Sequence, residues 1–169
     1  MEFRYCPACA EELRPITDGH DAGLPACPDG HYVHYENPAV TAFAFLRDGS
    51  GRYLALRRAH APASGEWDLP GGFVDAGEYP EETIRREITE ETGLHASDLE
   101  VFGAWTGRYG PGGKWTVDIA YHGHCPDGEI VLSPEKSEFA WVELEDFPTP
   151  AFNSERLALR KLLTKRMKT

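Results

Sequence analysis

Three glutamates in the middle of the chain constrain this sequence more than any other feature. Glu87, Glu90 and Glu91 stand at i, i+3 and i+4, so on a helix their side chains are neighbours and their like charges repel. At roughly 100° per residue, Glu91 projects between Ile84 and Ile88, which mark the apolar edge of the same helix. A glutamate at a core-facing angle costs free energy unless something pairs with it.

Local signals place these glutamates on a helix that runs from about residue 80 to residue 92. Pro80 suits its first turn, and Glu81 and Glu82 complement the positive end of its dipole. Gly93 suits its C-terminal cap. The preceding residues 69–72, LPGG, can bring backbone carbonyls close to a metal or a phosphate, because glycine adds no side-chain bulk. The stretch therefore predicts a turn-rich loop followed by an acidic helix.

The residues alone allow two interpretations of this acidic helix. In the first, the acids form a solvated face and pair with Arg85 and Arg86. In the second, they hold a hard divalent cation, since carboxylate oxygens suit Mg²⁺ or Mn²⁺. The angle of Glu91 and the glycine loop favour the second interpretation, but the residue pattern leaves both open.

The same stretch resembles the Nudix box, whose pattern is Gly, five residues, Glu, seven residues, Arg-Glu, an apolar residue, any residue, Glu-Glu, any residue, Gly and an apolar residue. Every constrained position matches, and these positions are Gly72, Glu78, Arg86, Glu87, Ile88, Glu90, Glu91, Gly93 and Leu94. The flanking sequence is also similar to the family, so the resemblance covers roughly residues 38 to 165.

The order of strand and helix patterns predicts an α/β fold with a mixed sheet between helices. Strand patterns occupy residues 40–46, 52–58, 99–106, 114–124 and 138–144, and a last helix starts near Ser154. The resemblance implies the Nudix α/β/α sandwich, in which the box forms a loop, a helix and a loop. Residues 1–36 are expected to form a small zinc-ribbon-like segment, and residues 37–169 the Nudix hydrolase domain.

The resemblance also implies roles for residues of the box. It implies a site for Mg²⁺ or Mn²⁺ whose ligands are Glu87, Glu90, Glu91 and the backbone carbonyl of Gly71. Arg86 is then expected to orient a box glutamate, namely Glu91. Glu78 is expected to support the box or to reach a metal through water.

The implied reaction is attack of water on a phosphorus atom, with loss of a phosphate-bearing leaving group. A general base helps to deprotonate the water. In this family the base is sometimes a box glutamate and sometimes a residue of a later loop. Glu135 and Glu138 are the later candidates; ordinary loop acids are the alternative for each, and we predict Glu138. The expected catalytic residues are Glu87, Glu91, Arg86 and Glu138.

The N-terminal segment holds three of the four cysteines, Cys6, Cys9 and Cys27, and few apolar residues. A segment this small usually needs a metal or a disulfide to hold it. The chain begins with acids and cysteines rather than a signal pattern, so the Cys-x-x-Cys spacing favours zinc or redox chemistry over a disulfide framework.

This segment resembles the zinc ribbon that precedes some Nudix domains, with one departure. Gly30 stands where the second cysteine of the second knuckle belongs. We predict a structural zinc site in which His31 joins the three cysteines. The alternatives are His20 or His34 as the fourth ligand, an exogenous ligand, and reduced cysteines without a metal.

Substrate choice is the least constrained property. Residues 95–115 lack the Gln-Pro-Trp-Pro-Phe-Pro-like motif that NADH pyrophosphatases of the family carry after the box. Pro111 lies near the position of a proline in ADP-ribose pyrophosphatases, and Tyr109 lies close to a tyrosine of diadenosine-polyphosphate hydrolases. We predict ADP-ribose or a related nucleotide sugar. A nucleoside-triphosphate pyrophosphatase, a diadenosine-polyphosphate hydrolase and a non-catalytic nucleotide-sensing module are the alternatives.

The charge balance bears on partners and location. A formal net charge of −11 argues against a nucleic-acid partner, which normally meets a basic face. It is compatible with a phosphate-cleaving enzyme if divalent cations mediate the contact. The longest uncharged apolar run, residues 40–46, is too short to cross a bilayer. We therefore expect a cytoplasmic protein with a small nucleotide substrate. Homodimers are common in similar enzymes, and the sequence leaves the oligomeric state open.

Overall fold

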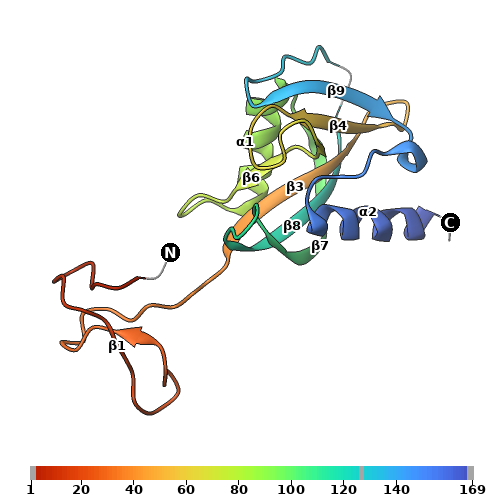
Figure 1. Cartoon of the computed structure of the whole chain (residues 1–169). Helices are drawn as coiled ribbons and strands as arrows, with labels where there is room; N and C mark the ends of the chain where they lie inside the picture. The colour runs from red at the N-terminus through yellow and green to blue at the C-terminus, as the bar shows by residue number, and fades with distance from the viewer. Residues whose placement is uncertain (1–2, 126–127, 167–169) are drawn as a thin grey trace. The chain divides into compact units, whose positions relative to one another are not determined.

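The computed structural model describes residues 3–125 and 128–166 of the chain. The chain divides into two compact units, Met1–Asn37 and Pro38–Thr169. In the first unit, β1 (Arg14–Pro15) pairs antiparallel with β2 (Pro25–Ala26). Turns, bends and irregular segments make up most of the rest of this unit (Figure 1).

The second unit is built on a mixed sheet, which contains seven strands within the described residues. The strands run in the order β5-β4-β3-β8-β7, while β6 pairs with β3 and β9 pairs with β4. Their bounds are β3 Ala39–Arg47, β4 Tyr53–Arg58, β5 Trp67–Asp68, β6 Gly71–Phe73, β7 Ser97–Arg108, β8 Trp115–His124 and β9 Lys136–Val142. The pairing of β3 with β8 is parallel, and the other strand pairs are antiparallel.

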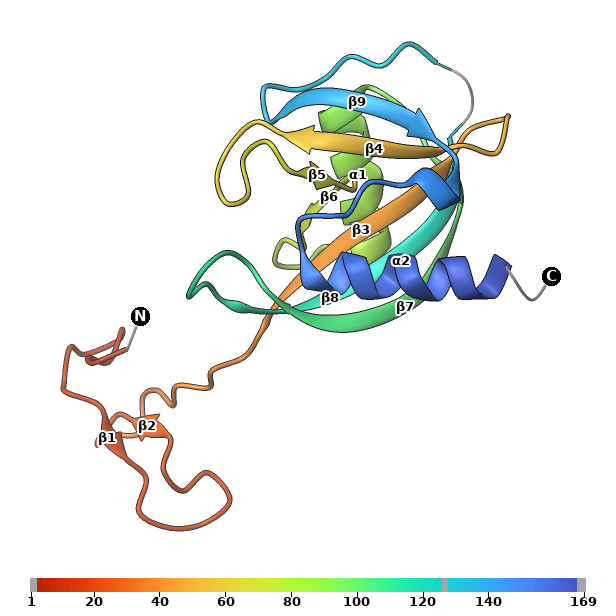
Figure 2. The same ribbon diagram turned by 45° about the vertical axis from the view of Figure 1, so that its right-hand side comes forward.

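Two helices cover opposite faces of this sheet, α1 (Pro80–Thr92) and α2 (Asn153–Arg166) (Figure 2). A short 3₁₀ helix, Leu144–Asp146, precedes α2. Strand β3 shows why both faces are covered, because its side chains alternate between two buried clusters. Ala42, Ala44 and Leu46 pack with the α1 side, whereas Phe43 and Phe45 pack with the α2 side. The expected α/β/α sandwich with a mixed sheet is confirmed.

Helix α1 has the bounds that its local signals predict. Its N-terminal backbone is capped by Glu82, whose carboxylate accepts a hydrogen bond from the Tyr79 N–H at 2.9 Å. Its C-terminus ends at Gly93, whose left-handed backbone (φ 73°) directs the N–H to the Thr89 carbonyl. Ile84 and Ile88 are fully buried. No helix in the described residues is long and apolar enough to cross a membrane.

The residues before α1 differ in part from the turn-rich loop that the sequence predicts. Residues 71–73 form the strand β6, with Gly71 opposite Phe43 of β3. A side chain at Gly71 would overlap the backbone of Ala42 and Phe43. Glycine therefore serves here to let two strands approach closely, rather than to form a turn.

Candidate active site

The box opens onto a cavity of about 490 Å³. Its walls come from β3, β6, α1, β7, β8 and the start of α2, so segments far apart in the sequence meet there. Part of its wall is formed by Gly71 and by residues of the box: Gly72, Arg86, Glu87, Glu90 and Glu91. The three glutamates predicted to act together are therefore brought into one cavity.

Glu91 is the most enclosed of the three, with 3% of its surface exposed. Lys136 lies 3.0 Å from its Oε1, and the Gly71 N–H donates to its Oε2 at 3.2 Å. Burial raises the pKa of the Glu91 carboxyl to about 8, although the attraction of Lys136 works in the opposite direction. Glu91, which the helical periodicity places on the core side of the helix, is thus buried, and its carboxyl group contacts both Lys136 and the Gly71 N–H.

The sequence predicts an Arg86–Glu91 contact, and the structure corrects it. The Arg86 guanidinium donates to Glu87 at 2.8 Å, to Glu90 at 3.1 Å and to Glu78 at 3.0 Å. Glu91 lies on the core side of α1, where Lys136 takes the place expected for Arg86. Arg86 therefore orients the two outer glutamates of the box.

Glu78 supports the box from the loop before α1. It accepts hydrogen bonds from Arg86 and, at 2.6 Å, from the Thr83 hydroxyl. The Arg86 bond, followed by the Thr83 bond, lowers the pKa of Glu78 to about 2. Gly72 is needed for space, because a Cβ there would overlap the Glu87 carboxylate. Loop and helix are thus joined by short contacts that a larger residue at Gly72 would break.

The donor set fits a hard divalent cation. Burial raises the pKa of Glu87, and repulsion from Glu90 and Glu135 adds to this effect against the pull of Arg86. Carboxylates gathered in one cavity are the ligands that Mg²⁺ and Mn²⁺ prefer, and a cation relieves their repulsion. The carbonyl of Gly71 stays a predicted ligand; its N–H already holds Glu91.

A buried ion network lies behind Glu91. Asp68 is 3.1 Å from Lys136 and 2.6 Å from Arg58. Burial raises the pKa of Asp68, but Lys136 and Arg58 outweigh it and hold the pKa below its ordinary value. Burial raises the pKa of the neighbouring Glu155 carboxyl well above its ordinary value. Sequence reasoning missed Asp68, Lys136 and Glu155, because an isolated charge in a strand or helix pattern gives no sign of its partner.

The two candidates for the general base occupy different places. Glu135 lines the cavity, and its charge acts on Glu87. Glu138, which the sequence analysis favours, is not among the described residues that line the cavity. Its carboxylate instead pairs with Arg57 at 3.3 Å, with both side chains partly exposed. The geometry therefore favours Glu135.

Another part of the cavity wall is aromatic and basic. Tyr109 and Phe152 are stacked, with ring centroids 5.5 Å apart and an interplanar angle of 19°. Arg58 donates to the Tyr109 hydroxyl at 3.3 Å, and its guanidinium lies 5.1 Å from the Phe152 ring centre. Tyr109 was singled out by the sequence, whereas Phe152 was not. An aromatic surface beside a cation suits a nucleotide.

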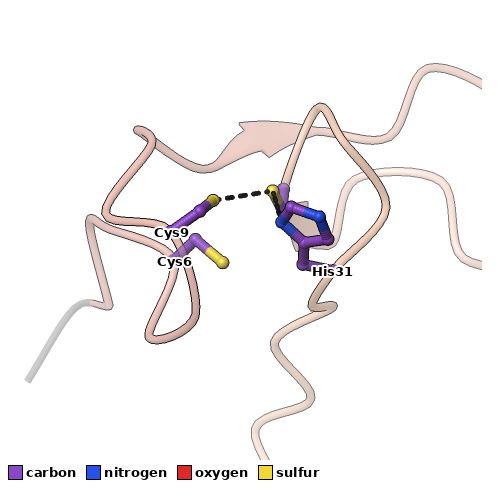
Figure 3. Close-up of side chains that lie close together, drawn as sticks. Cys6, Cys9 and His31 are labelled. Carbon is purple, nitrogen blue, oxygen red and sulfur yellow. Dashed lines mark hydrogen bonds between the residues drawn. The ribbon is translucent and has the colours of Figure 1, made fainter.

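A second cluster of candidate ligands lies in the N-terminal unit. The ligand atoms of Cys6, Cys9, Cys27 and His31 all lie within 4.8 Å of one another. Figure 3 shows the side chains of Cys6, Cys9 and His31 close together. The Cys9 and Cys27 sulfurs are 3.5 Å apart. His34, the rival of His31, instead stacks on Phe3. Three thiols and one imidazole are a donor set that fits tetrahedral Zn²⁺.

Comparison with known proteins decides the family. The NUDIX domain model matches residues 37–162. The chain belongs to the Nudix family. This membership bears out the resemblance read from the box, and the family is one of pyrophosphatases.

Relatives of this Nudix domain carry different names. An "ADP-ribose pyrophosphatase" of Methanocaldococcus jannaschii is 29% identical over 126 residues, which cover 75% of this chain and 74% of that protein. The human "NAD(P)H pyrophosphatase NUDT13, mitochondrial" is 28% identical over 144 residues, or 83% of this chain. The match spans only 40% of the human protein.

Solved structures agree with the fold. A NUDIX hydrolase from Nitrosomonas europaea superposes with a TM-score of 0.78 at 22% identity, covering 98% of this chain and 93% of that one. A MutT protein from Methanosarcina mazei superposes with a TM-score of 0.65 at 28% identity, covering 79% and 99%. The Nudix architecture is thus supported independently of the box motif.

Proposed function

We propose that this Nudix protein is a Mg²⁺-dependent hydrolase that splits the pyrophosphate linkage of ADP-ribose or a related nucleotide sugar. The observation that carries the proposal is the single cavity that joins the three box glutamates to the Arg58, Tyr109 and Phe152 wall. The glutamates suit metal-bound phosphates, and the aromatic wall suits a nucleoside. The archaeal relative named as an ADP-ribose pyrophosphatase adds support for this substrate class.

Glu87, Glu90 and Glu91 are the proposed ligands of Mg²⁺ or Mn²⁺, with the Gly71 carbonyl as a further one. When bound, the cation neutralises phosphate charge and lowers the pKa of a coordinated water. Arg86 holds the two outer carboxylates in place. Lys136 and the Gly71 N–H hold Glu91 from the core side.

The proposed reaction is hydrolysis of the phosphoanhydride. A water oxygen bonds to one phosphorus, the bond from that phosphorus to the bridging oxygen breaks, and the products are AMP and ribose 5-phosphate. Glu135 is the proposed acceptor of the proton of the attacking water, because it lines the cavity and its charge acts on Glu87.

Substitution of glutamine for Glu135 or for Glu138 tests which of the two is the general base. Glu135→Gln is expected to lower kcat by about 10²- to 10⁴-fold, the usual contribution of a general base. Glu138→Gln is the matched control, because it removes only a partly exposed ion pair with Arg57. It is expected to change kcat only slightly. Steady-state kinetics on both variants decide the assignment, and the reverse order of effects would restore Glu138.

Metal binding is expected to release a proton from Glu91. The pKa of its buried carboxyl is raised to about 8, so it is mostly protonated at pH 7, whereas a metal ligand must be ionised. Mg²⁺ affinity should therefore increase as pH rises towards 8 and level off above it. Calorimetric titrations in two buffers of different ionisation enthalpy measure the released proton. Equal heats in both buffers at pH 7 would contradict the raised pKa.

The substrate proposal is tested by chromatography of products from a panel. The panel contains ADP-ribose, NADH, a diadenosine polyphosphate and nucleoside triphosphates, each with Mg²⁺, and Glu91→Gln serves as the inactive control. Metal-dependent AMP release from ADP-ribose supports the proposal. Pyrophosphate release from a triphosphate would favour the alternative enzyme, and saturable binding without turnover would favour a nucleotide-sensing module. Turnover of another compound of the panel would support the proposed hydrolysis but contradict ADP-ribose as the substrate.

We further propose that the N-terminal unit holds a structural zinc ion. The support is the convergence of three thiols and His31, from two separate turns, on one point. The four donors come from a segment that lacks a large apolar core, so metal coordination supplies what packing does not.

A further inference from the structure

Three polar side chains beside Gly107 line one part of the cavity wall, which we call the recess: Thr116, Asp118 and Ser154. Gly107 pairs with Thr116 across β7 and β8. A Cβ at this position would overlap Oδ2 of Asp118 and would lie 3.0 Å from the Thr116 hydroxyl and 3.3 Å from the Ser154 hydroxyl. Gly107 is not among the described glycines with a left-handed backbone. The missing side chain therefore leaves room for the Asp118 carboxylate rather than giving backbone freedom.

The three side chains around this space are buried and polar. Thr116, Asp118 and Ser154 are 3%, 6% and 2% exposed, and all three line the cavity. They come from β8 and α2, so the recess forms only in the folded domain. Buried oxygens normally have hydrogen-bond partners, and here their open side is the cavity.

Asp118 has one oxygen engaged and one directed to the recess. The Thr41 hydroxyl, from the neighbouring strand β3, donates to its Oδ1 at 2.6 Å. Within residues 3–125 and 128–166, no donor is assigned to Oδ2. Oδ2 is also not among the buried atoms without a partner in the described residues, so it is open to the cavity. A ligand that supplies an N–H group at this point would form a hydrogen bond to a charged acceptor.

The chemistry of the recess selects among nucleobases. Oδ2 of Asp118 accepts only, whereas the Thr116 and Ser154 hydroxyls can donate or accept. Adenine presents an exocyclic amine, which donates, beside a ring nitrogen, which accepts. On the edge that carries this amine and the ring nitrogen N7, hypoxanthine has the same shape but presents a carbonyl oxygen in place of the amine, so this edge offers no donor. The hypoxanthine oxygen would face the Asp118 carboxylate, and Oδ2 would receive no hydrogen bond from the base.

We propose that this recess is the nucleobase subsite and that Asp118 determines a preference for adenine over hypoxanthine. The adenine amine donates to Oδ2, and a hydroxyl of Thr116 or Ser154 donates to the adjacent ring nitrogen. The base then lies in the part of the cavity that Tyr109 and Phe152 line, where aromatic rings can stack on it. The inference deepens the proposed function and rests on its assignment of the cavity to a nucleotide.

The test compares binding of AMP and IMP to the full chain by calorimetry. The wild type is expected to bind AMP about 10- to 100-fold more tightly, the usual range for a hydrogen bond to a charged group. Asp118→Asn should remove or reverse the preference, because its amide can still accept from Thr41 and can donate to the hypoxanthine oxygen. Asp98→Asn is the matched control; Asp98 is exposed on β7, and asparagine tolerates its positive φ of 50°.

Equal affinity for AMP and IMP in the wild type overturns the subsite, as does a preference that survives Asp118→Asn. The wild-type comparison holds even if that variant does not fold. Gly107→Ala is a second variant; its Cβ should displace the Asp118 carboxylate, and AMP binding should weaken by a similar factor.

Hydrolysis of ADP-ribose and of its inosine analogue separates failure of the subsite from failure of the proposed function. Equal turnover of both compounds overturns the subsite and leaves the hydrolase intact. Absence of turnover with either compound contradicts the proposed substrate, and the AMP and IMP affinities then still decide the subsite.

Discussion

Glu91→Gln is expected to lower kcat by about 10³-fold, a loss of the size that metal and electrostatic groups of active sites contribute. Glutamine keeps the size of the side chain but removes the anionic oxygens proposed to hold Mg²⁺. The fold should survive, because Lys136 retains Asp68 as a partner at 3.1 Å. The unfolding temperature is therefore expected to change by no more than a few degrees.

Two measurements make this prediction specific. Steady-state kinetics give the loss of kcat, and electron paramagnetic resonance with Mn²⁺ gives the metal affinity without any need for turnover. Glu81→Gln is the matched control, because Glu81 lies on the same helix and forms an exposed pair with Arg85. It should leave both quantities unchanged. Full activity of Glu91→Gln would remove Glu91 from the metal site.

Removal of zinc from the N-terminal unit is the second large effect that we expect. Zinc coordination contributes about 10–16 kcal/mol to the folding of small zinc-finger peptides, far more than a unit of this size gains from packing. Purified protein should contain one zinc per chain. Cys27→Ala should lose the metal, and the amide signals of residues 3–37 should collapse towards random-coil positions in nuclear magnetic resonance spectra.

Matched variants are available for both kinds of ligand. Cys125→Ala should keep its zinc, since Cys125 is buried in the other unit, where burial raises the pKa of its thiol to about 11. His31→Ala should weaken zinc binding, whereas His34→Ala should not, because the His34 ring packs on Phe3 outside the cluster. An N-terminal unit that keeps its spectrum without zinc would rule out the structural metal.

Local features of the chain were predictable from the sequence. The bounds of α1 follow from Pro80 at its start and Gly93 at its end, which act within one helical turn. The burial of Glu91 follows from helical periodicity. The strands β3, β4, β7, β8 and β9 follow from apolar patterns, to within two residues at their ends. Each of these properties depends on near neighbours along the chain.

The cluster of candidate zinc ligands was predictable from the sequence only in part. The Cys-x-x-Cys spacing already indicates a metal, but the choice among His20, His31 and His34 depends on how two turns meet. The structure brings His31 to Cys6, Cys9 and Cys27. The zinc site could be predicted because its candidate ligands lie within one short segment and are only cysteines and histidines.

The partners of the charged groups were not predictable, because they come from elements far apart in the chain. Arg86 could have reached any box glutamate, and the position of Lys136 beside Glu91 depends on how β9 packs next to α1. Glu135 and Glu138 are equivalent as loop acids until the strand pairing with β4 directs Glu138 to Arg57. The recess over Gly107 needs β3, β7, β8 and α2 together. Spacing along the chain thus specified helix α1 and its glutamates. The ion-pair partners of these charged groups and the shape of the cavity depend on packing between segments far apart in the chain. No local sequence pattern encodes the distances between such segments.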